Sequence, residues 1–280
     1  SSAASDVYKR QLFTKAEGRN EMDSIWINAP AKINIGLDVI RRREDGYHEV
    51  KMIMQSIRLF DRLTLTKTKE PGIKLTTNLS YLPVNEDNLV YQSAKRLMDE
   101  FHLEGGLDIK LDKRIPVAAG MAGGSTDAAS CMLAINDLYG LGLSKRHLMK
   151  RGVKLGADIP YCILKGTALS EGIGEKLSTI PAMPSCYILI AKPNIHVSTK
   201  WVYTNLVLDE HTNHPDIDGM LASMKKRDLL SLSNQIGNVL ESVTIPAYPQ
   251  IAAIKECMLQ NGALGSLMSG SAVSYTHLRA

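Results

Sequence analysis

The chain has 280 residues, of which 44% are hydrophobic and 22% are charged, and its formal net charge is +4 at pH 7. These fractions are near the globular average, so they allow a sizeable core in one large domain or two ordinary ones. The positive charge is small and dispersed, which argues against nucleic-acid binding and fits anionic small molecules. No apolar run approaches the roughly 18 residues of a membrane span, so we expect no membrane partner.

The four cysteines lie far apart and show no metal-binding spacing. Three of them, Cys131, Cys162 and Cys186, lie in apolar runs, which predicts buried thiols and a cytoplasmic location. Residues 1–21 are polar and aperiodic and lack the apolar core of a signal peptide. We therefore expect a non-native or disordered leader before Met22.

The first part of the chain after the expected leader is β-rich. Residues 24–28 form a short apolar strand, and residues 32–39 alternate between apolar and polar side chains as a half-buried strand does. This alternation places Lys32 and Asn34 on the same polar face. A lysine in such a place is usually just solvated.

A turn around Asp45-Gly46 follows, and Tyr47 and His48 come directly after it. An aromatic pair beside a turn can stack on a planar ligand, or Tyr47 can simply pack against the core. Residues 49–57 and 63–68 then read as two further strands.

A strand, a glycine-rich loop and a helix follow one another in the middle of the chain. Residues 85–103 show helical periodicity and residues 107–111 alternate as a strand, before the sequence Pro-Val-Ala-Ala-Gly-Met-Ala-Gly-Gly-Ser-Thr-Asp-Ala-Ala at 116–129. Glycines let the backbone approach a ligand, and a helix N-terminus offers unpaired N–H groups to an anion. The alternative is an ordinary loop before a capped helix.

The spacing of this loop excludes two common phosphate loops. No Lys-Ser/Thr pair follows its last glycine, and G-x-G-x-x-G is absent, so it is neither a Walker A loop nor a Rossmann fingerprint. The remaining interpretation is a loop whose backbone N–H groups hold a nucleoside triphosphate. Ser125 or Thr126 could then reach a metal ion or a phosphate oxygen.

Asp158 is the candidate base for phosphoryl transfer. Ser144 predicts the N-cap of a helix through Lys154, and Pro160 biases Ile159 to an extended backbone, which places Asp158 on a loop entering a strand at 161–164. An aspartate there is often a turn residue. Phosphoryl transfer needs positive charge and a group that accepts the hydroxyl proton, which Lys32 and Asp158 can supply. Spacing alone does not bring them together.

The last part of the chain mixes helices and strands. A composition shift near residue 178 suggests a boundary near 175, followed by a strand at 186–191 and helices at 198–206, 221–240 and 249–260. A second Gly/Ser-rich loop, residues 262–270, could instead be a turn into a last strand.

Three motifs together resemble those of the GHMP kinases, which include galactose, homoserine, mevalonate and phosphomevalonate kinases. The glycine-rich loop resembles their second motif, Ala-Pro-Ala-Lys-Ile-Asn-Ile-Gly-Leu at 29–37 resembles the first, and Leu-Met-Ser-Gly-Ser at 267–271 resembles the third. Arg-Glu-Asp-Gly-Tyr-His-Glu-Val at 43–50 and Leu-Gly-Ala-Asp-Ile-Pro-Tyr at 155–161 are similar to signatures of the branch that phosphorylates 4-diphosphocytidyl-2-C-methyl-D-erythritol, in the non-mevalonate route to isoprenoids.

Two alternatives remain beside this branch. One is another GHMP kinase, of the homoserine or mevalonate type, against which Asp-Gly-Tyr-His argues. The other is a non-catalytic nucleotide- or sugar-binding regulator on the same fold, against which the retention of both Lys32 and Asp158 argues.

The resemblance implies a two-domain α+β fold. Residues 22–175 would form an N-terminal ATP-binding domain like ribosomal protein S5 domain 2, and residues 176–273 a ferredoxin-like C-terminal domain. Residues 274–280 do not resemble the family's continuation, so we expect an atypical, non-native tail.

The resemblance also implies roles for individual residues. Lys32 and Asp158 match the catalytic pair, in which Asp158 deprotonates the acceptor hydroxyl and Lys32 keeps Asp158 ionised and stabilises developing charge. Asn34, Tyr47 and His48 match the site for the cytidyl substrate, with His48 reading the cytosine edge. The members of the ATP-phosphate loop would be Pro116, Val117, Ala118, Ala119, Gly120, Met121, Ala122, Gly123, Gly124, Ser125 and Thr126.

The expected partners are ATP with Mg²⁺ and the cytidyl substrate, and the protein is expected to be a monomer or a homodimer; no metal ligands are assigned.

Two positions depart from the family's pattern. Ala122 and Ala272 each stand where the family has Gly. A left-handed Ala122 would cost on the order of 1 kcal/mol, so we expect an αR or β conformation there. Ala272 would loosen the third loop.

Overall fold

The computed structural model describes residues 11–13, 23–195, 197–270 and 275–279, and Ala272 lies outside them. The chain divides into two compact units that alternate along the sequence. The first comprises Ser1–Ala31, Ile57–Val117 and Ala122–Leu164, and the second comprises Lys32–Ser56, Ala118–Met121 and Lys165–Ala280. The expected domain limits, with a single boundary near residue 175, stay a prediction.

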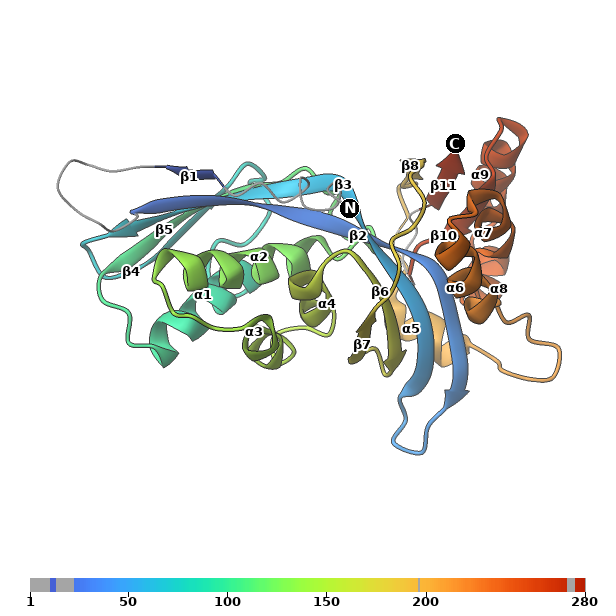
Figure 1. Cartoon of the computed structure of the whole chain (residues 1–280), viewed down its shortest axis with the longest axis horizontal. Coiled ribbons are helices and arrows are strands. Elements are labelled where there is room, and N and C mark those ends of the chain that lie inside the picture. Colours follow the sequence, from blue (N-terminus) through green and yellow to red (C-terminus); the bar gives the residue numbers. More distant parts are fainter. Residues whose placement is uncertain (1–10, 14–22, 196, 271–274, 280) are drawn as a thin grey trace. The chain divides into compact units, whose positions relative to one another are not determined.

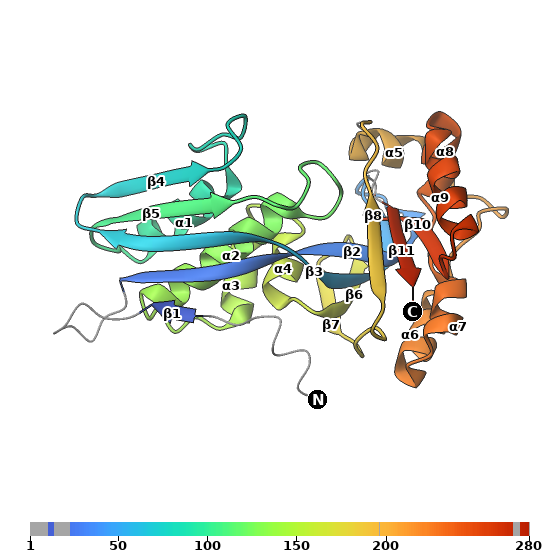
Figure 2. The same ribbon diagram turned by 90° about the horizontal axis from the view of Figure 1, so that it is seen from above.

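The first unit contains a sheet with the strand order β1-β2-β3-β5-β4, which can be followed in Figure 2. The bounds of these strands are β1 Gln11–Phe13, β2 Ser24–Arg42, β3 His48–Thr68, β4 Gly72–Thr77 and β5 Gly106–Asp112. β3 pairs antiparallel with β5 from Arg62 to Thr68, and β4 pairs parallel with β5.

In two places, segments that the sequence predicts as two separate strands form one continuous strand. Residues 24–28 and 32–39 belong to β2, because Pro30 fixes φ at a value compatible with extended backbone and does not end the strand. Likewise, β3 runs unbroken through Asp61, whose side chain is fully buried. β2 and β3 therefore each contribute residues to both units.

Helices cover one face of this sheet, as Figure 1 shows. Their bounds are α1 Leu89–Glu100, α2 Gly123–Leu138, α3 Lys145–Gly152 and α4 Ile159–Leu164. Asn88 caps α1, and Ser144 caps α3 as predicted. α2 is the central helix, because its side chains from Thr126 to Ile135 are all buried.

The strand predicted at 161–164 is wrong, since these residues form α4. Pro160 is the second residue of this helix. Its missing N–H costs nothing there, because the first N–H groups of a helix have no intrahelical partner. Asp158 therefore lies directly before a helix and not before a strand.

The second unit has strands of its own. Their bounds are β6 Thr167–Gly172, β7 Lys176–Thr179, β8 Tyr187–Ala191, β9 Gly237–Asn238, β10 Gly265–Met268 and β11 Tyr275–Arg279. β6 pairs with β7 and with the first half of β3, and β9 pairs parallel with β2. β10, β11 and β8 form a three-stranded antiparallel sheet, so the predicted atypical tail supplies its middle strand. The non-native origin of the leader and the tail stays a prediction.

The helices of the second unit are α5 Thr199–Asn205, α6 Ile217–Lys226, α7 Leu229–Gln235, α8 Glu241–Ala247 and α9 Gln250–Gln260. The single helix predicted at 221–240 is wrong. Arg227 takes a left-handed conformation that ends α6, and Asp228 caps α7 by accepting a hydrogen bond from the Ser231 N–H. Sequence reasoning also missed β4, β7 and α8. Among the helices of the described ranges, none has the length and apolar character needed to cross a membrane.

Candidate active site

The glycine-rich loop has an unusual backbone. Ala118, Gly120 and Ala122 have φ values of 55°, 69° and 54°, so three residues of this short loop lie in the left-handed region. α2 begins at Gly123, and Ala122 offers it no side-chain cap. The first N–H groups of α2 therefore have no capping side chain, which is the arrangement that an anion cradle needs. ATP binding by this loop stays a prediction.

The predicted conformation of Ala122 is wrong. Its φ of 54° and ψ of 34° are left-handed, although the sequence predicted an αR or β conformation. The structural reason is that this residue turns the chain into α2, with the Thr126 N–H donating to its carbonyl oxygen at 2.8 Å. An alanine in this region carries the steric cost that a glycine avoids.

Ala122→Gly is therefore expected to raise the free energy of unfolding by about 1 kcal/mol. The matched control is Ala128→Gly, in the regular part of the same helix. It removes the same methyl group and is expected to lower stability by about 1 kcal/mol or more. Urea denaturation of the two variants measures both values, and a loss of stability in Ala122→Gly would contradict the strain at this position.

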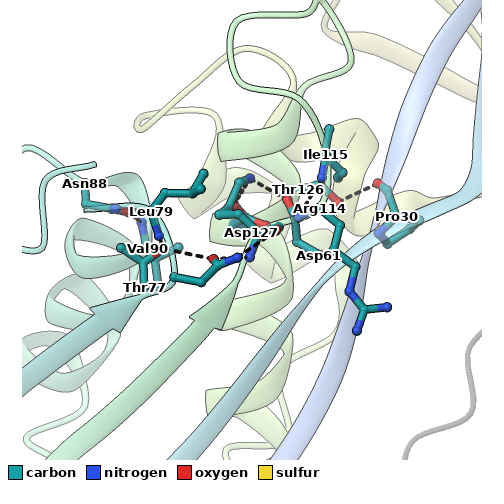
Figure 3. Close-up of polar contacts among 12 residues, drawn as sticks. Pro30, Asp61, Thr77, Leu79, Asn88, Val90, Arg114, Ile115, Thr126 and Asp127 are labelled. Atoms are coloured by element: carbon teal, nitrogen blue, oxygen red, sulfur yellow. Dashed lines mark hydrogen bonds and ion pairs between the residues drawn. The ribbon is translucent and has the colours of Figure 1, made fainter. Parts of the chain in front are cut away.

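A buried ion cluster holds both ends of the loop (Figure 3). The Lys113 ammonium group donates to Oδ2 of Asp127, at 2.7 Å, and to Oδ2 of Asp61. Oδ1 of Asp61 accepts from the backbone N–H groups of Arg114 at 2.5 Å and Ile115 at 2.8 Å. The segment entering the loop and the first turns of α2 are thus tied to the same point on β3.

The cluster leaves little room for a side chain at Gly123. A Cβ atom there would lie 3.2 Å from the Lys113 ammonium nitrogen and 3.4 Å from Cγ2 of Ile115. Asn78 also holds the backbone of Lys113 through two hydrogen bonds, of 2.8 and 3.0 Å. At the other side, the Thr126 hydroxyl donates to the Pro30 carbonyl oxygen at 2.8 Å. Thr126 thus joins α2 to β2, so its hydroxyl is engaged with the fold.

Burial governs the charges of the cluster. It raises the pKa of Asp127 well above its usual value, and the nearby Asp61 charge adds to this shift while Lys113 opposes it. For Lys113, burial favours the neutral amine, but the two carboxylates more than offset this and raise its pKa. Oδ1 of Asp127 has no hydrogen-bond partner within the described ranges. The cluster therefore keeps its ammonium charge, and burial favours the protonated form of Asp127.

Asp158 lies in the first unit, half-buried and directly before α4. Its carbonyl oxygen accepts from the Cys162 N–H at 3.0 Å, so its backbone begins the helix. A Cβ atom on Gly156 would lie 3.9 Å from the Ser125 hydroxyl oxygen. The segment that carries Asp158 therefore passes close to the N-terminus of α2, within one unit.

Lys32 and Asn34 lie in the second unit and are buried on the same face of β2. The Lys32 ammonium group donates to Oδ1 of Asn34 at 3.2 Å. The backbone N–H of Lys32 donates to the Met121 carbonyl oxygen at 3.1 Å, and that of Asn34 donates to the Ser269 hydroxyl oxygen at 3.1 Å. The predicted first and third motifs and one residue of the glycine-rich loop therefore meet. The pairing of Lys32 with Asp158 stays a prediction.

The predicted substrate residues at the β2–β3 turn behave differently from one another. Tyr47 is 61% exposed, which excludes the interpretation that it packs in the core. The His48 ring lies against the Tyr203 ring of α5, with the centroids 5.1 Å apart. Burial, and then the charge of Arg42, lower the pKa of His48, which favours the neutral imidazole. Sequence reasoning missed Tyr203, because nothing in the helical pattern of residues 198–206 links it to a histidine 155 positions earlier.

Comparisons with known proteins agree with these motifs. The family model for the GHMP kinases N terminal domain matches residues 88–166, and the model for the GHMP kinases C terminal region matches residues 220–271. A 4-diphosphocytidyl-2-C-methyl-D-erythritol kinase of Lachnoclostridium phytofermentans is 56% identical, over 89% of this chain and 86% of the relative. The enzyme of the same name from Lachnospira eligens is 53% identical, over 89% of this chain and 87% of the relative.

Solved structures give the same result. A crystal structure of 4-(cytidine 5'-diphospho)-2C-methyl-D-erythritol kinase has a TM-score of 0.79 and 31% identity, over 90% of this chain and 89% of that chain. Homoserine kinase from Cytophaga hutchinsonii, at 22% identity and a TM-score of 0.70 over 96% of this chain and 87% of that chain, shares the fold. The chain belongs to the GHMP kinase family, and its predicted two-domain α+β fold class is confirmed.

Proposed function

We propose that this protein transfers the γ-phosphoryl group of ATP to the 2-hydroxyl of 4-diphosphocytidyl-2-C-methyl-D-erythritol, a step in the formation of isoprenoid precursors. Relatives that are 56% and 53% identical over most of their length carry the name of this kinase. The observation that carries the proposal is the His48 ring placed against Tyr203 beside the exposed Tyr47, since aromatic rings and a neutral imidazole suit a cytosine base.

The proposed mechanism divides the work between the loop and two charged side chains. The N–H groups at the start of α2 hold the ATP phosphates, since a helix N-terminus favours negative charge. Asp158 orients the acceptor hydroxyl and takes its proton, and Lys32 stabilises the negative charge of the transferring group. Little covalent chemistry is required of the protein, because phosphoryl transfer depends mainly on positioning and electrostatics.

A magnesium ion is proposed to accompany ATP. No group of three or more His, Cys, Asp and Glu side chains that could hold a metal ion occurs in the part of the chain that the structure describes. This fits an ion held largely by phosphate oxygens and water, as Mg²⁺ often is in kinases, with the half-buried Ser125 hydroxyl as a protein ligand. When bound, the ion would neutralise phosphate charge.

The test is an ADP-release assay with the cytidyl substrate, homoserine and mevalonate in parallel. We expect turnover with the cytidyl substrate alone. Faster turnover with homoserine or mevalonate would favour another GHMP kinase. ATP binding without ADP release from any of the three would favour a non-catalytic regulator.

His48→Ala is expected to raise the KM for the cytidyl substrate by about 10- to 100-fold and to leave ATP affinity unchanged. The reason is the loss of a hydrogen bond to the base, which leaves a polar group of the base unsatisfied at a cost of about 1–3 kcal/mol. Steady-state kinetics and titration with ATP measure the two effects. His147→Ala, on the exposed face of α3, is the control and should change neither. Equal weakening of both ligands in His48→Ala would mean that His48 supports the fold instead.

The proposed partners of this protein are ATP and the cytidyl substrate, and its proposed oligomeric state is a monomer or a homodimer. Its cytoplasmic location stays a prediction from the cysteine pattern. Light scattering after gel filtration distinguishes the two oligomeric states.

A further inference from the structure

A buried asparagine outside the three motifs lies beside the strand that carries Lys32. Asn238 is 6% exposed and belongs to β9. Gly237 and Asn238 pair parallel with Gly36 and Leu37 of β2, and the Val239 N–H donates to the Leu37 carbonyl oxygen at 3.0 Å. This short segment is thereby fixed to β2, four to five residues after Lys32.

The side chain of Asn238 uses both ends of its amide group. Nδ2 donates to the carbonyl oxygens of Met268 and Gly270, each at 2.7 Å, and Oδ1 accepts from the Leu240 N–H at 3.0 Å. Glu241 also binds this segment, because its Oε1 accepts a hydrogen bond from the Met268 N–H at 2.6 Å. These bonds fix the backbone of the third motif, and they define which end of the Asn238 amide faces it.

The third motif in turn contacts the candidate active site. Ser269 is fully buried and accepts the backbone N–H of Asn34 at 3.1 Å. Gly270 has a φ of 72°, and a Cβ atom on it would lie 3.6 Å from the Gly120 carbonyl oxygen and 3.9 Å from the Lys32 ammonium nitrogen. This segment therefore lies close to the Lys32 ammonium group and is bonded to the strand that carries it.

We infer that Asn238 is a positioning residue of the kinase, which sets the place of Lys32 by holding the third motif against β2. The inference rests on the proposed function. Asn238 acts through the segment that contains Ser269 and Gly270. A misplacement of about 1 Å in a catalytic group can cost on the order of 100-fold in rate, so the holding bonds matter for turnover.

Asn238→Asp isolates the two bonds that carry this inference. The aspartate keeps the shape of the side chain and an acceptor for the Leu240 N–H. However, it replaces the donor that faces the Met268 and Gly270 carbonyl oxygens with a third acceptor. We expect kcat to fall by about 10- to 100-fold, while the KM for the cytidyl substrate changes by less than about threefold, the pattern of a lost transition-state interaction.

Asn136→Asp is the matched control, because Asn136 clamps Leu143 through both ends of its amide, at 2.8 and 3.3 Å. It lies near the C-terminal end of α2, on the order of 20 Å along the helix from the glycine-rich loop. We expect a comparable loss of thermal stability and an unchanged kcat. Asn238→Ser, which keeps one hydroxyl donor, should give an intermediate kcat.

Hydrogen exchange gives a second readout that needs no substrate. The Asn34 amide hydrogen, bonded to Ser269, should exchange at least about 10-fold faster in Asn238→Asp and at the wild-type rate in Asn136→Asp. Unchanged exchange at Asn34 overturns the inference, whatever the substrate proves to be. A fall in kcat that is equal in the two variants also overturns it, since Asn238 would then be merely structural. An inactive wild-type protein with normal exchange differences would instead overturn the proposed function alone.

Discussion

Asp158→Asn is expected to lower kcat with the cytidyl substrate by about 100- to 10,000-fold, the usual contribution of a general base. The asparagine keeps the shape of the side chain and loses the ability to take the hydroxyl proton. The backbone role of Asp158, which begins α4 through its carbonyl oxygen, is unaffected by this change. ATP binding should change little, because the glycine-rich loop proposed to bind ATP is held by contacts that do not include this carboxylate.

Asp99→Asn is the control for the loss of one carboxylate charge. Asp99 is 64% exposed on α1 and forms a surface ion pair with Lys95, which contributes little to stability. Its variant should keep the wild-type kcat. Single-turnover measurements with saturating ATP separate the chemical step from product release. Near-wild-type turnover in Asp158→Asn would exclude Asp158 as the base. Its role would then be the structural one of beginning α4 through its carbonyl oxygen.

Much of the site could be predicted because its residues follow local rules. The glycine-rich loop, the helix after it and the turn before Tyr47 each depend on neighbours in the sequence, and the structure has all three. The alternation of β2 placed Lys32 and Asn34 on one face, and the 3.2 Å contact between them confirms it.

Long-range polar contacts left no such signal. Asp61 and Lys113 are 52 positions apart, and Asn238 reaches Gly270 across 32 positions. No period or motif spacing links such pairs, since only the fold brings them together. The errors at α4 and Ala122 have a related cause. In both, the fold overrode a local preference. Ile159 is helical in α4 although it precedes Pro160, and Ala122 has a positive φ where it turns the chain into α2.

Lys113→Met is expected to lower the free energy of unfolding by about 3–5 kcal/mol, the cost of removing one partner from a buried ion pair. The side chains of Lys113, Asp61 and Asp127 are 5%, 0% and 2% exposed, so water cannot replace the ammonium group. Methionine fills a similar volume, which limits the contribution of a cavity. Urea denaturation measures the effect, and a loss below 1 kcal/mol would show that the cluster contributes little to stability.

The pH dependence and a double variant separate charge from packing. Burial already raises the pKa of Asp127 in the folded protein, and removing Lys113 should raise it further. A folded-state pKa above the unfolded value destabilises the protein as pH rises through that range, so the defect of Lys113→Met should be smaller at pH 5 than at pH 8. Adding Asp127→Asn removes the carboxyl group whose pKa is raised and should recover about 1 kcal/mol or more of the loss at pH 8. A defect that is equal at both pH values and is not reduced in the double variant would mean that lost packing, and not an unpaired charge, destabilises this end of the loop.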